Sequence, residues 1–192
     1  MGSESGITSQ QVDVCALPGA AIFSDGVSAN SPVNFGPYAT SSFDRLRILE
    51  RYRRIAMVGL SSNQFRPSHF AAIYLLSEGY DVIPVNPREK EVLNLRSYPT
   101  LLDVPGSVDI VDIFREPAAV PGLVDEAIKI GAKVVWMQLG VIHEEAAQRA
   151  RDAGLEVVMD RCLKIEHARF FGGLSTLGLN TGVISSKKRN NM

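Results

Sequence analysis

The sequence has little cysteine and no excess of positive charge. Its 192 residues include two cysteines, Cys15 and Cys162, which form no CxxC pair. A chain of this length buries a sizeable core without disulfides, so we expect reduced thiols and a cytoplasmic protein. Lysine and arginine total 20 against 21 acidic residues, for a net charge of −1. This balance argues against binding to nucleic acid.

Several enzyme motifs are also absent. The sequence contains no GxGxxG, GK[ST], HExxH or GxSxG, which argues against a standard dinucleotide fingerprint, a Walker loop, a zinc protease and a hydrolase nucleophile. Its three histidines, His69, His143 and His167, lack the spacing of metal ligands, so we expect no metal. Asp13 and Pro18 interrupt the first apolar stretch, so we expect neither a signal peptide nor a membrane span.

Apolar segments of strand length alternate with helical segments along most of the chain, which is 45% hydrophobic and 21% charged. Strands are expected at residues 55–60, 80–86, 108–114, 132–139 and 155–160. Helices are expected at residues 42–54, 67–79, 116–131, 143–154 and 163–171. Residues 87–106 form an irregular crossover that could hold a helical turn near Leu101. This alternation predicts an α/β fold, a Rossmann-like doubly wound parallel five-stranded sheet in a single domain.

The two ends of the chain differ from this regular region. Residues 1–42 are rich in glycine, serine, proline and asparagine without a sustained period, so we expect a flexible N-terminal arm. The domain is expected over residues 43–171, and residues 172–192 would form a C-terminal tail.

The turn after the first predicted strand carries groups suited to an anion. Ligands of doubly wound sheets bind beyond the carboxyl ends of the strands. Gly59 allows close approach of the backbone, Arg66 supplies a positive charge, and Pro67 begins a helix whose amides face the ligand. The residues predicted to bind phosphate are Gly59, Leu60, Ser61, Ser62, Arg66, Pro67 and Ser68. The alternative is a plain polar turn with a solvated Arg66.

The turn after the second strand lacks the acid that usually accepts from the ribose hydroxyls of NAD. Asn86 stands there instead, followed by Pro87, Arg88 and Lys90. Cations at this place suit a phosphorylated ribose, which occurs in both NADP and coenzyme A. These residues do not discriminate between NADP and coenzyme A. The alternative interpretation is a rigid turn whose charged side chains lie on the surface.

The remaining strand ends offer fewer polar groups. Phe114 could cover an adenine or belong to the core, and Arg115 could face the ligand or solvent. Gln138 is a plausible hydrogen-bonding group, whereas Trp136 is expected in the core. Cys162 follows the last strand and could face the cleft, where Arg161 and Lys164 would favour its thiolate and allow a mixed disulfide with a bound thiol. A lone cysteine is more often structural.

Several motifs together resemble a known family. "RPS" after the first strand, "PVNP", "YP", "VDIVDIF", "GAKVVWMQLG" and "MDRC" occur in an order and spacing similar to those of the small CoA-binding proteins of the YccU type. These proteins look like the free-standing CoA-binding domain of the succinyl-CoA synthetase α subunit. The resemblance covers residues 53–167. Asn94 departs from it, because the family commonly has glycine there, but asparagine tolerates the left-handed backbone.

The resemblance implies coenzyme A or an acyl-CoA as the ligand. It implies that residues 59–68 hold the pyrophosphate and that Asn86, Arg88 and Lys90 lie near the adenosine and its 3′-phosphate. Phe114, Arg115 and Gln138 would line the cleft. The resemblance does not carry ligase activity, because the ligase also needs a phosphohistidine domain and a β subunit, so no catalytic residue is predicted. The alternatives are an NADP-dependent oxidoreductase and a CoA-sensing module that regulates a partner. A homo-oligomer or an unknown protein partner is also possible.

Overall fold

Short apolar runs form a five-stranded parallel sheet in the computed structural model, which describes residues 40–172. The strands are β1 (Arg54–Val58), β2 (Asp81–Val85), β5 (Ile110–Ile113), β6 (Val134–Met137) and β7 (Glu156–Val158). They lie side by side in the order β2-β1-β5-β6-β7. The predicted positions of the strands are therefore confirmed, although each strand is shorter than its apolar run.

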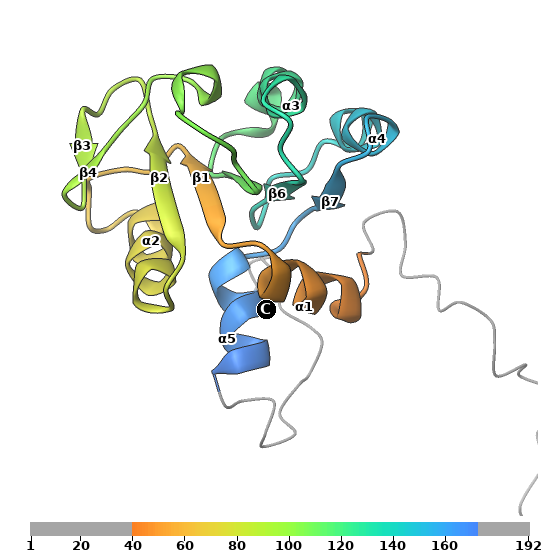
Figure 1. Ribbon diagram of the computed structural model, residues 1–192, viewed down its shortest axis with the longest axis horizontal. Helices are drawn as coiled ribbons and strands as arrows, with labels where there is room; N and C mark the ends of the chain where they lie inside the picture. Colours follow the sequence, from red (N-terminus) through yellow and green to blue (C-terminus); the bar gives the residue numbers. More distant parts are fainter. Residues whose placement is uncertain (1–39, 173–192) are drawn as a thin grey trace, which may run out of the picture. The chain divides into compact units, whose positions relative to one another are not determined.

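Helices cover both faces of this sheet (Figure 1). One layer, the α2–α5 face, contains α1 (Ser42–Arg51), α2 (Pro67–Ser77) and α5 (Leu163–Phe171), and the other, the α3–α4 face, contains α3 (Val120–Lys129) and α4 (Glu144–Asp152). Side chains alternate between the two apolar cores: Ile55 and Met57 of β1 pack on the α2–α5 face, whereas Ala56 and Val58 pack on the other. Both faces of the sheet are buried, as a parallel sheet requires. The predicted Rossmann-like α/β fold is confirmed.

The direction of the strand order reverses between β1 and β5. From β1 the chain passes through α2 to β2 on one side, then returns to place β5 on the other side of β1. The loops that leave β1 and β5 therefore diverge at their carboxyl ends. This switch point is where open α/β sheets bind ligands.

The crossover from β2 to β5 has more structure than predicted. It contains a hairpin of β3 (Glu91–Val92) and β4 (Leu95–Arg96), followed by the expected helical turn at Leu101–Asp103. Leu93 and Asn94 form the hairpin turn, with φ angles of 55° and 60°. Asn94 thus adopts the left-handed conformation expected of it. The left-handed conformation is unfavourable for leucine, but the side chain of Leu93 packs against the core of the α2–α5 face.

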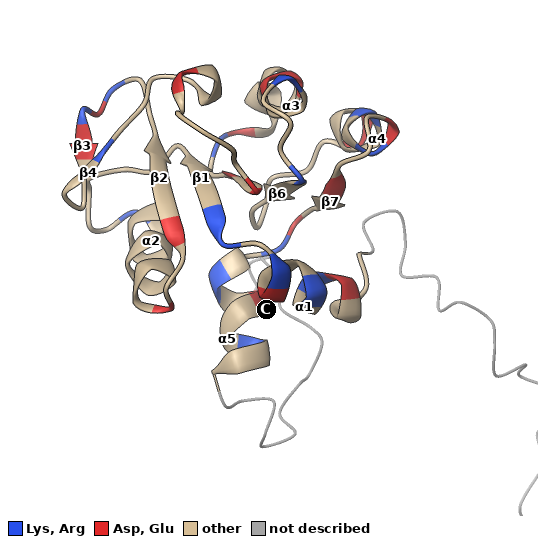
Figure 2. Ribbon diagram, viewed as in Figure 1, with Lys and Arg blue, Asp and Glu red and all other residues tan. Residues whose placement is uncertain are grey.

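A buried ion cluster joins α1 to α5. Arg45 Nε lies 2.8 Å from Glu166 Oε2, and Arg169 Nη1 lies 3.2 Å from Glu166 Oε1. All three residues are buried. Most other charges lie on helices, loops and the starts of strands (Figure 2). Asp112, in the middle of the sheet, is an exception with no exposed surface.

Some of the predicted features lie outside the described residues. These are the proposed arm, except for residues 40–42, and nearly all of the proposed tail. Within the described part, Ser41 caps α1 by accepting from the backbone N–H of Asp44, and Ser42 belongs to that helix. No helix between residues 40 and 172 is long and apolar enough to cross a membrane.

Candidate functional site

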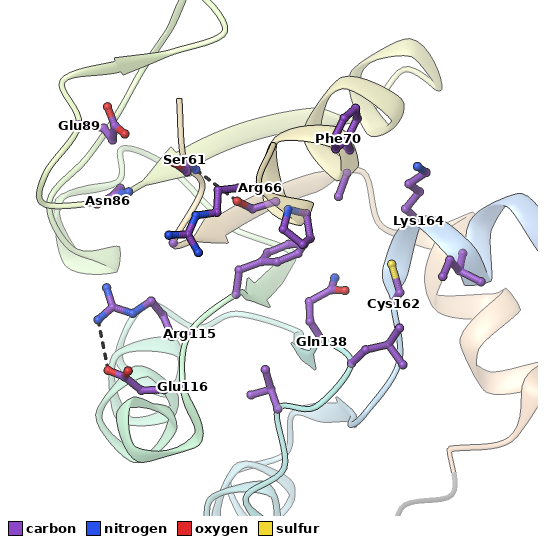
Figure 3. A pocket seen from close by; sticks show the side chains of 18 of the residues that line it. Ser61, Arg66, Phe70, Asn86, Glu89, Arg115, Glu116, Gln138, Cys162 and Lys164 are labelled. Atoms are coloured by element: carbon purple, nitrogen blue, oxygen red, sulfur yellow. Dashed lines mark hydrogen bonds and ion pairs between the residues drawn. The ribbon is translucent and has the colours of Figure 1, made fainter. Parts of the chain in front are cut away.

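A cavity of about 1050 Å³ lies at the switch point. This volume lies just above the range of about 300–1,000 Å³ found for small-molecule sites, so the cavity has room for a large ligand. Figure 3 shows Arg66, Asn86, Glu89 and Arg115 toward one end and Gln138, Cys162 and Lys164 toward the other. Predicted residues that line the cavity are Gly59, Ser61, Arg66, Pro67, Ser68, Asn86, Arg88, Phe114, Arg115 and Gln138. Leu60, Ser62, Pro87 and Lys90 do not line it.

Gly59 brings the first turn close to the end of β5. Its φ angle is 88°, and a Cβ added to it would stand 2.7 Å from the carbonyl oxygen of Phe114. Glycine is therefore required here both by the backbone conformation and by the available space. The side chain of Leu60, the next residue, is fully buried in the core of the α2–α5 face and does not line the cavity. Its carbonyl oxygen accepts a hydrogen bond from Asn86 Nδ2.

The loop from Ser61 to Ser68 is held by its own polar groups. The N–H of Ser61 donates to Ser68 Oγ at 3.3 Å, and the N–H of Asn63 donates to Ser61 Oγ at 3.2 Å. His69 Nδ1 lies 2.9 Å from the carbonyl oxygen of Ser61. These contacts fix the loop, while the exposed Arg66 extends into the cavity (Figure 3).

The N-terminus of α2 opens toward the same loop. Pro67 occupies its first turn, and within residues 40–172 no side chain caps its N-terminal amides. Partial positive charge at such an uncapped helix end favours an anion. Together with Arg66, this helix N-terminus places positive charge at this end of the cavity.

Asn86 ties the second turn to the first. Its Nδ2 donates to the carbonyl oxygen of Leu60 at 2.9 Å, and its Oδ1 accepts from the N–H of Arg88 at 3.0 Å. Asn86 therefore positions Arg88 at the edge of the cavity while its own side-chain groups are engaged. Pro87 and Lys90 are exposed on the same turn, outside the lining.

Glu89 is a lining residue that the sequence did not predict. Its Oε1 accepts from the N–H of Ser62 at 3.2 Å and from the hydroxyl of Ser62 at 2.9 Å. This carboxylate occupies the donors of Ser62 in the same way as a bound anion would. Glu116 is a second acid in the lining, and its Oε1 lies 3.6 Å from Nη2 of Arg115.

Gln138 and Asp112 form a buried polar pair at the opposite end. Gln138 Nε2 donates to Asp112 Oδ1 at 2.7 Å, and within the described part of the chain Asp112 Oδ2 has no hydrogen-bond partner. Burial raises the pKa of the Asp112 carboxyl to about 7, although the hydrogen bond from Gln138 lowers it. Trp136 lies next to Asp112 in the sheet as a core residue, as predicted, and its indole N–H donates to the carbonyl oxygen of Arg161.

Cys162 lines the cavity, but its environment does not favour a thiolate. Burial raises the pKa of the thiol, and the nearby Asp112 raises it further, which outweighs the opposing effect of Lys164 and of backbone hydrogen bonds. Arg161 donates to the carbonyl oxygen of Asp160 instead. The expectation that Arg161 and Lys164 would activate this cysteine is therefore wrong.

Apolar parts of the lining were also missed. They are Phe70, Ala71, Leu139, Val141 and Ile165. Phe70 is 53% exposed on α2. Between residues 40 and 172 no group of three or more histidine, cysteine or acidic side chains could hold a metal ion.

The sequence and the fold are similar to those of known proteins. The profile of the CoA binding domain family matches residues 53–168. The uncharacterized protein YneT of Bacillus subtilis is 40% identical over 121 residues, which cover 63% of this chain and 90% of YneT. A hypothetical protein from Pyrococcus horikoshii has a solved structure with a TM-score of 0.67 and 41% identity, covering 74% of this chain and 97% of that one.

A longer enzyme also shares this region. The ADP-forming acetate–CoA ligase II of Archaeoglobus fulgidus is 30% identical over 145 residues. The match covers 73% of this chain but 21% of the ligase. The similarity therefore concerns one part of that enzyme.

Proposed function

The chain belongs to the CoA-binding domain family, and from this premise we propose that its switch-point cavity binds coenzyme A or an acyl-CoA. The observation that carries the proposal is the polarity of the cavity. Arginines and an uncapped helix N-terminus lie toward one end, together with Glu89, whereas apolar side chains, the thiol of Cys162 and the ammonium group of Lys164 lie toward the other. Coenzyme A has the matching polarity, with three phosphates on its adenosine side and a pantetheine arm ending in a thiol.

The loop between β1 and α2 is the proposed pyrophosphate site. Pro67 has no N–H and the N–H of His69 donates to the carbonyl oxygen of Arg66, so the backbone donor of the first turn of α2 is the N–H of Ser68. Together with the guanidinium of Arg66 and the hydroxyl of Ser61, it can donate toward an anion there. The conformation of Gly59 brings the backbone of this turn close to the ligand. Ser62 could join them after Glu89 releases its donors.

The turn after β2 is the proposed site of the adenosine 3′-phosphate. Asn86 positions Arg88, which lines the cavity, and Lys90 adds positive charge nearby from an exposed position. Phe114 is half-buried in the lining and offers an apolar surface to the adenine. This assignment explains why an amide rather than an acid follows β2, because an acid there would repel the phosphate.

The other end of the cavity would hold the pantetheine arm. Leu139, Val141 and Ile165 supply apolar contacts, and Gln138 supplies a hydrogen-bonding group. The role we propose is binding, without catalysis by this chain. The similarity to the acetate–CoA ligase covers about a fifth of that enzyme, so it does not support transfer of ligase activity.

Calorimetric titration with a series of related ligands tests the proposal. We expect coenzyme A to bind tightly, dephospho-CoA to bind more weakly because it lacks the 3′-phosphate, and NAD to bind weakest. NADP, which carries its phosphate on the 2′ position, separates CoA recognition from general recognition of a phosphorylated ribose. Native mass spectrometry of the freshly purified protein would identify a ligand carried from the cell.

The outcomes separate the parts of the proposal. Absence of binding by coenzyme A and by acyl-CoA would overturn it. Equal affinities for coenzyme A and dephospho-CoA would remove the role of Arg88 and Lys90 while leaving the pyrophosphate site. Tighter binding of NADP than of coenzyme A would favour a dinucleotide site.

A further inference from the structure

The state of Asp112 determines which atom Gln138 can present to the cavity. An ionised carboxylate has only acceptor atoms, so the amide of Gln138 must turn its NH₂ group toward Asp112, as the 2.7 Å contact shows. The amide oxygen of Gln138 is then the atom left for a ligand. Gln138 is buried and lines the cavity, whereas Asp112 lies behind it with no exposed surface.

We propose that Asp112 is a positioning residue that holds Gln138 with its amide oxygen toward the cavity, where this oxygen accepts a hydrogen bond from an amide N–H of the pantetheine arm. The inference rests on the proposed binding of coenzyme A and adds a specificity determinant to it. Asp112 makes no contact with the ligand and acts through Gln138. Its neighbours in register, Met57 and Trp136, belong to the apolar core and do not pair with an acid.

The Gln138–Asp112 pair has a second state, because a glutamine amide can donate to an ionised carboxylate or accept from a protonated one. A protonated Asp112 gains an O–H donor, and a half-turn of the Gln138 amide would present its oxygen to that donor. The cavity would then face the NH₂ group, which cannot accept a hydrogen bond. The carboxyl has a pKa of about 7, so both states are populated near neutral pH.

Among residues 40–172, the other charged or titratable side chains at this end of the cavity are those of Lys164 and Cys162. On β1 and β6 the side chains in register with Asp112 are Met57 and Trp136, which carry no charge. Before α5, the thiol of Cys162 interacts with the charge of Asp112, but its raised pKa keeps it neutral around pH 7. The protonation of Asp112 is therefore the change expected at this end of the cavity.

The experiment measures the affinity for coenzyme A by calorimetry at about pH 8 and about pH 6 in the full-length protein and in Asp112→Asn. With a pKa near 7, the ionised fraction of Asp112 falls about tenfold between these values, so wild-type affinity should fall about tenfold more than that of the variant. Asparagine is isosteric and does not titrate. Comparison of the two proteins with one ligand removes the titration of the ligand phosphates.

Proton release gives a second readout that a purely structural role would not change. Near pH 7, binding of coenzyme A to wild type should release about half a proton more than binding to Asp112→Asn. Titrations in buffers of different ionisation enthalpy measure this difference. The matched control is Asp109→Asn, since Asp109 lies at the opposite end of β5, where it accepts from the backbone N–H groups of Arg53 and Arg54. It should keep the wild-type pH profile.

A second variant covers the case in which Asp112→Asn fails to fold. Gln138→Met keeps the side-chain length without an amide, so it should bind coenzyme A more weakly and without the tenfold fall. Identical pH profiles in wild type and in the variant that folds would overturn the role of Asp112 while leaving CoA binding intact. Absence of CoA binding by wild type at either pH would instead overturn the proposed function and this inference with it.

Discussion

Gly59 and Phe114 approach each other at the point where the two halves of the sheet diverge. A Cβ on Gly59 would stand 2.7 Å from the carbonyl oxygen of Phe114, and the φ angle of Gly59 is 88°. We therefore expect Gly59→Ala to lower the free energy of unfolding by about 2–4 kcal/mol, from the left-handed backbone and the clash together. Chemical denaturation measures this change.

Gly154→Ala is the matched control for this substitution. Gly154 has a similar φ angle of 84°, but a Cβ there would meet nothing within 4 Å. It should cost about 1–2 kcal/mol, from the backbone conformation alone. Equal losses in the two variants would show that the contact with Phe114 can relax, and that the close approach is not what requires glycine.

Arg66 should contribute to binding and little to stability. Its side chain is exposed at the cavity and is expected to make a charge-assisted hydrogen bond to a phosphate. Arg66→Ala should weaken CoA binding by about 1–3 kcal/mol and leave the melting temperature nearly unchanged. Arg151→Ala, an exposed arginine on α4, should leave affinity unaltered. Unchanged affinity in Arg66→Ala would favour a plain polar turn over a phosphate loop.

Glu89 should oppose ligand binding. Its carboxylate holds both donors of Ser62 and places a negative charge in the cavity that is expected to receive phosphates. Glu89→Gln keeps an acceptor for Ser62 but removes the charge, so CoA affinity should increase by about 0.5–1 kcal/mol. Glu91→Gln removes an exposed acid outside the cavity and should have a smaller effect. Weaker binding in Glu89→Gln would show that the carboxylate supports the loop in its binding conformation.

The sequence predicted the strands and helices because both leave periodic patterns of apolar residues. It also predicted about half of the lining residues, because strand ends in a doubly wound sheet converge at a known place. Leu60 was assigned to the ligand from its position in the turn, but the chain bends back after Gly59 and buries that side chain. A one-residue change of direction of this kind depends on tertiary packing and leaves no periodic pattern of apolar residues in the sequence.

Other lining residues come from elements that a linear pattern does not associate with the site. Glu89 reaches Ser62 across 27 positions, and Ile165 enters from α5, far along the chain. Asp112 lies within an apolar strand, where its pairing with Gln138 follows only from the parallel register of β5 and β6. These features require strand order and side-chain direction, which the sequence alone does not specify.

The ion cluster between α1 and α5 should be important for stability. Glu166 is paired with both Arg45 and Arg169, and all three are buried. Glu166→Gln would leave two buried guanidinium groups without a counter-charge, so we expect a loss of about 3 kcal/mol in the free energy of unfolding. Glu156→Gln removes one of the two acidic partners of the more exposed Arg47 and should cost at most about 1 kcal/mol. Similar small losses in both variants would mean that solvent reaches the buried cluster.

Asp112 should make the stability of the protein depend on pH in an unusual direction. Burial raises the pKa of its carboxyl from 3.8 to about 7, so the folded state holds a proton that the unfolded state has already lost. The favourable contribution of the neutral acid is complete below about pH 4. It decreases as the pH rises and is fully lost once the pH passes about 7, a change of roughly 4 kcal/mol for the whole shift.

Asp112→Asn should lack this loss because asparagine does not titrate. We expect the free energy of unfolding of wild type, measured by urea denaturation between about pH 5 and about pH 8, to fall relative to that of the variant. The stabilities should therefore differ most in favour of asparagine at the alkaline end, where wild type buries a charge with one hydrogen bond. Asp109→Asn keeps Asp112, so its stability should fall with rising pH in the same way as that of wild type. A difference between wild type and Asp112→Asn that stays constant with pH would show that Asp112 ionises with a nearly ordinary pKa, and that water reaches its second oxygen.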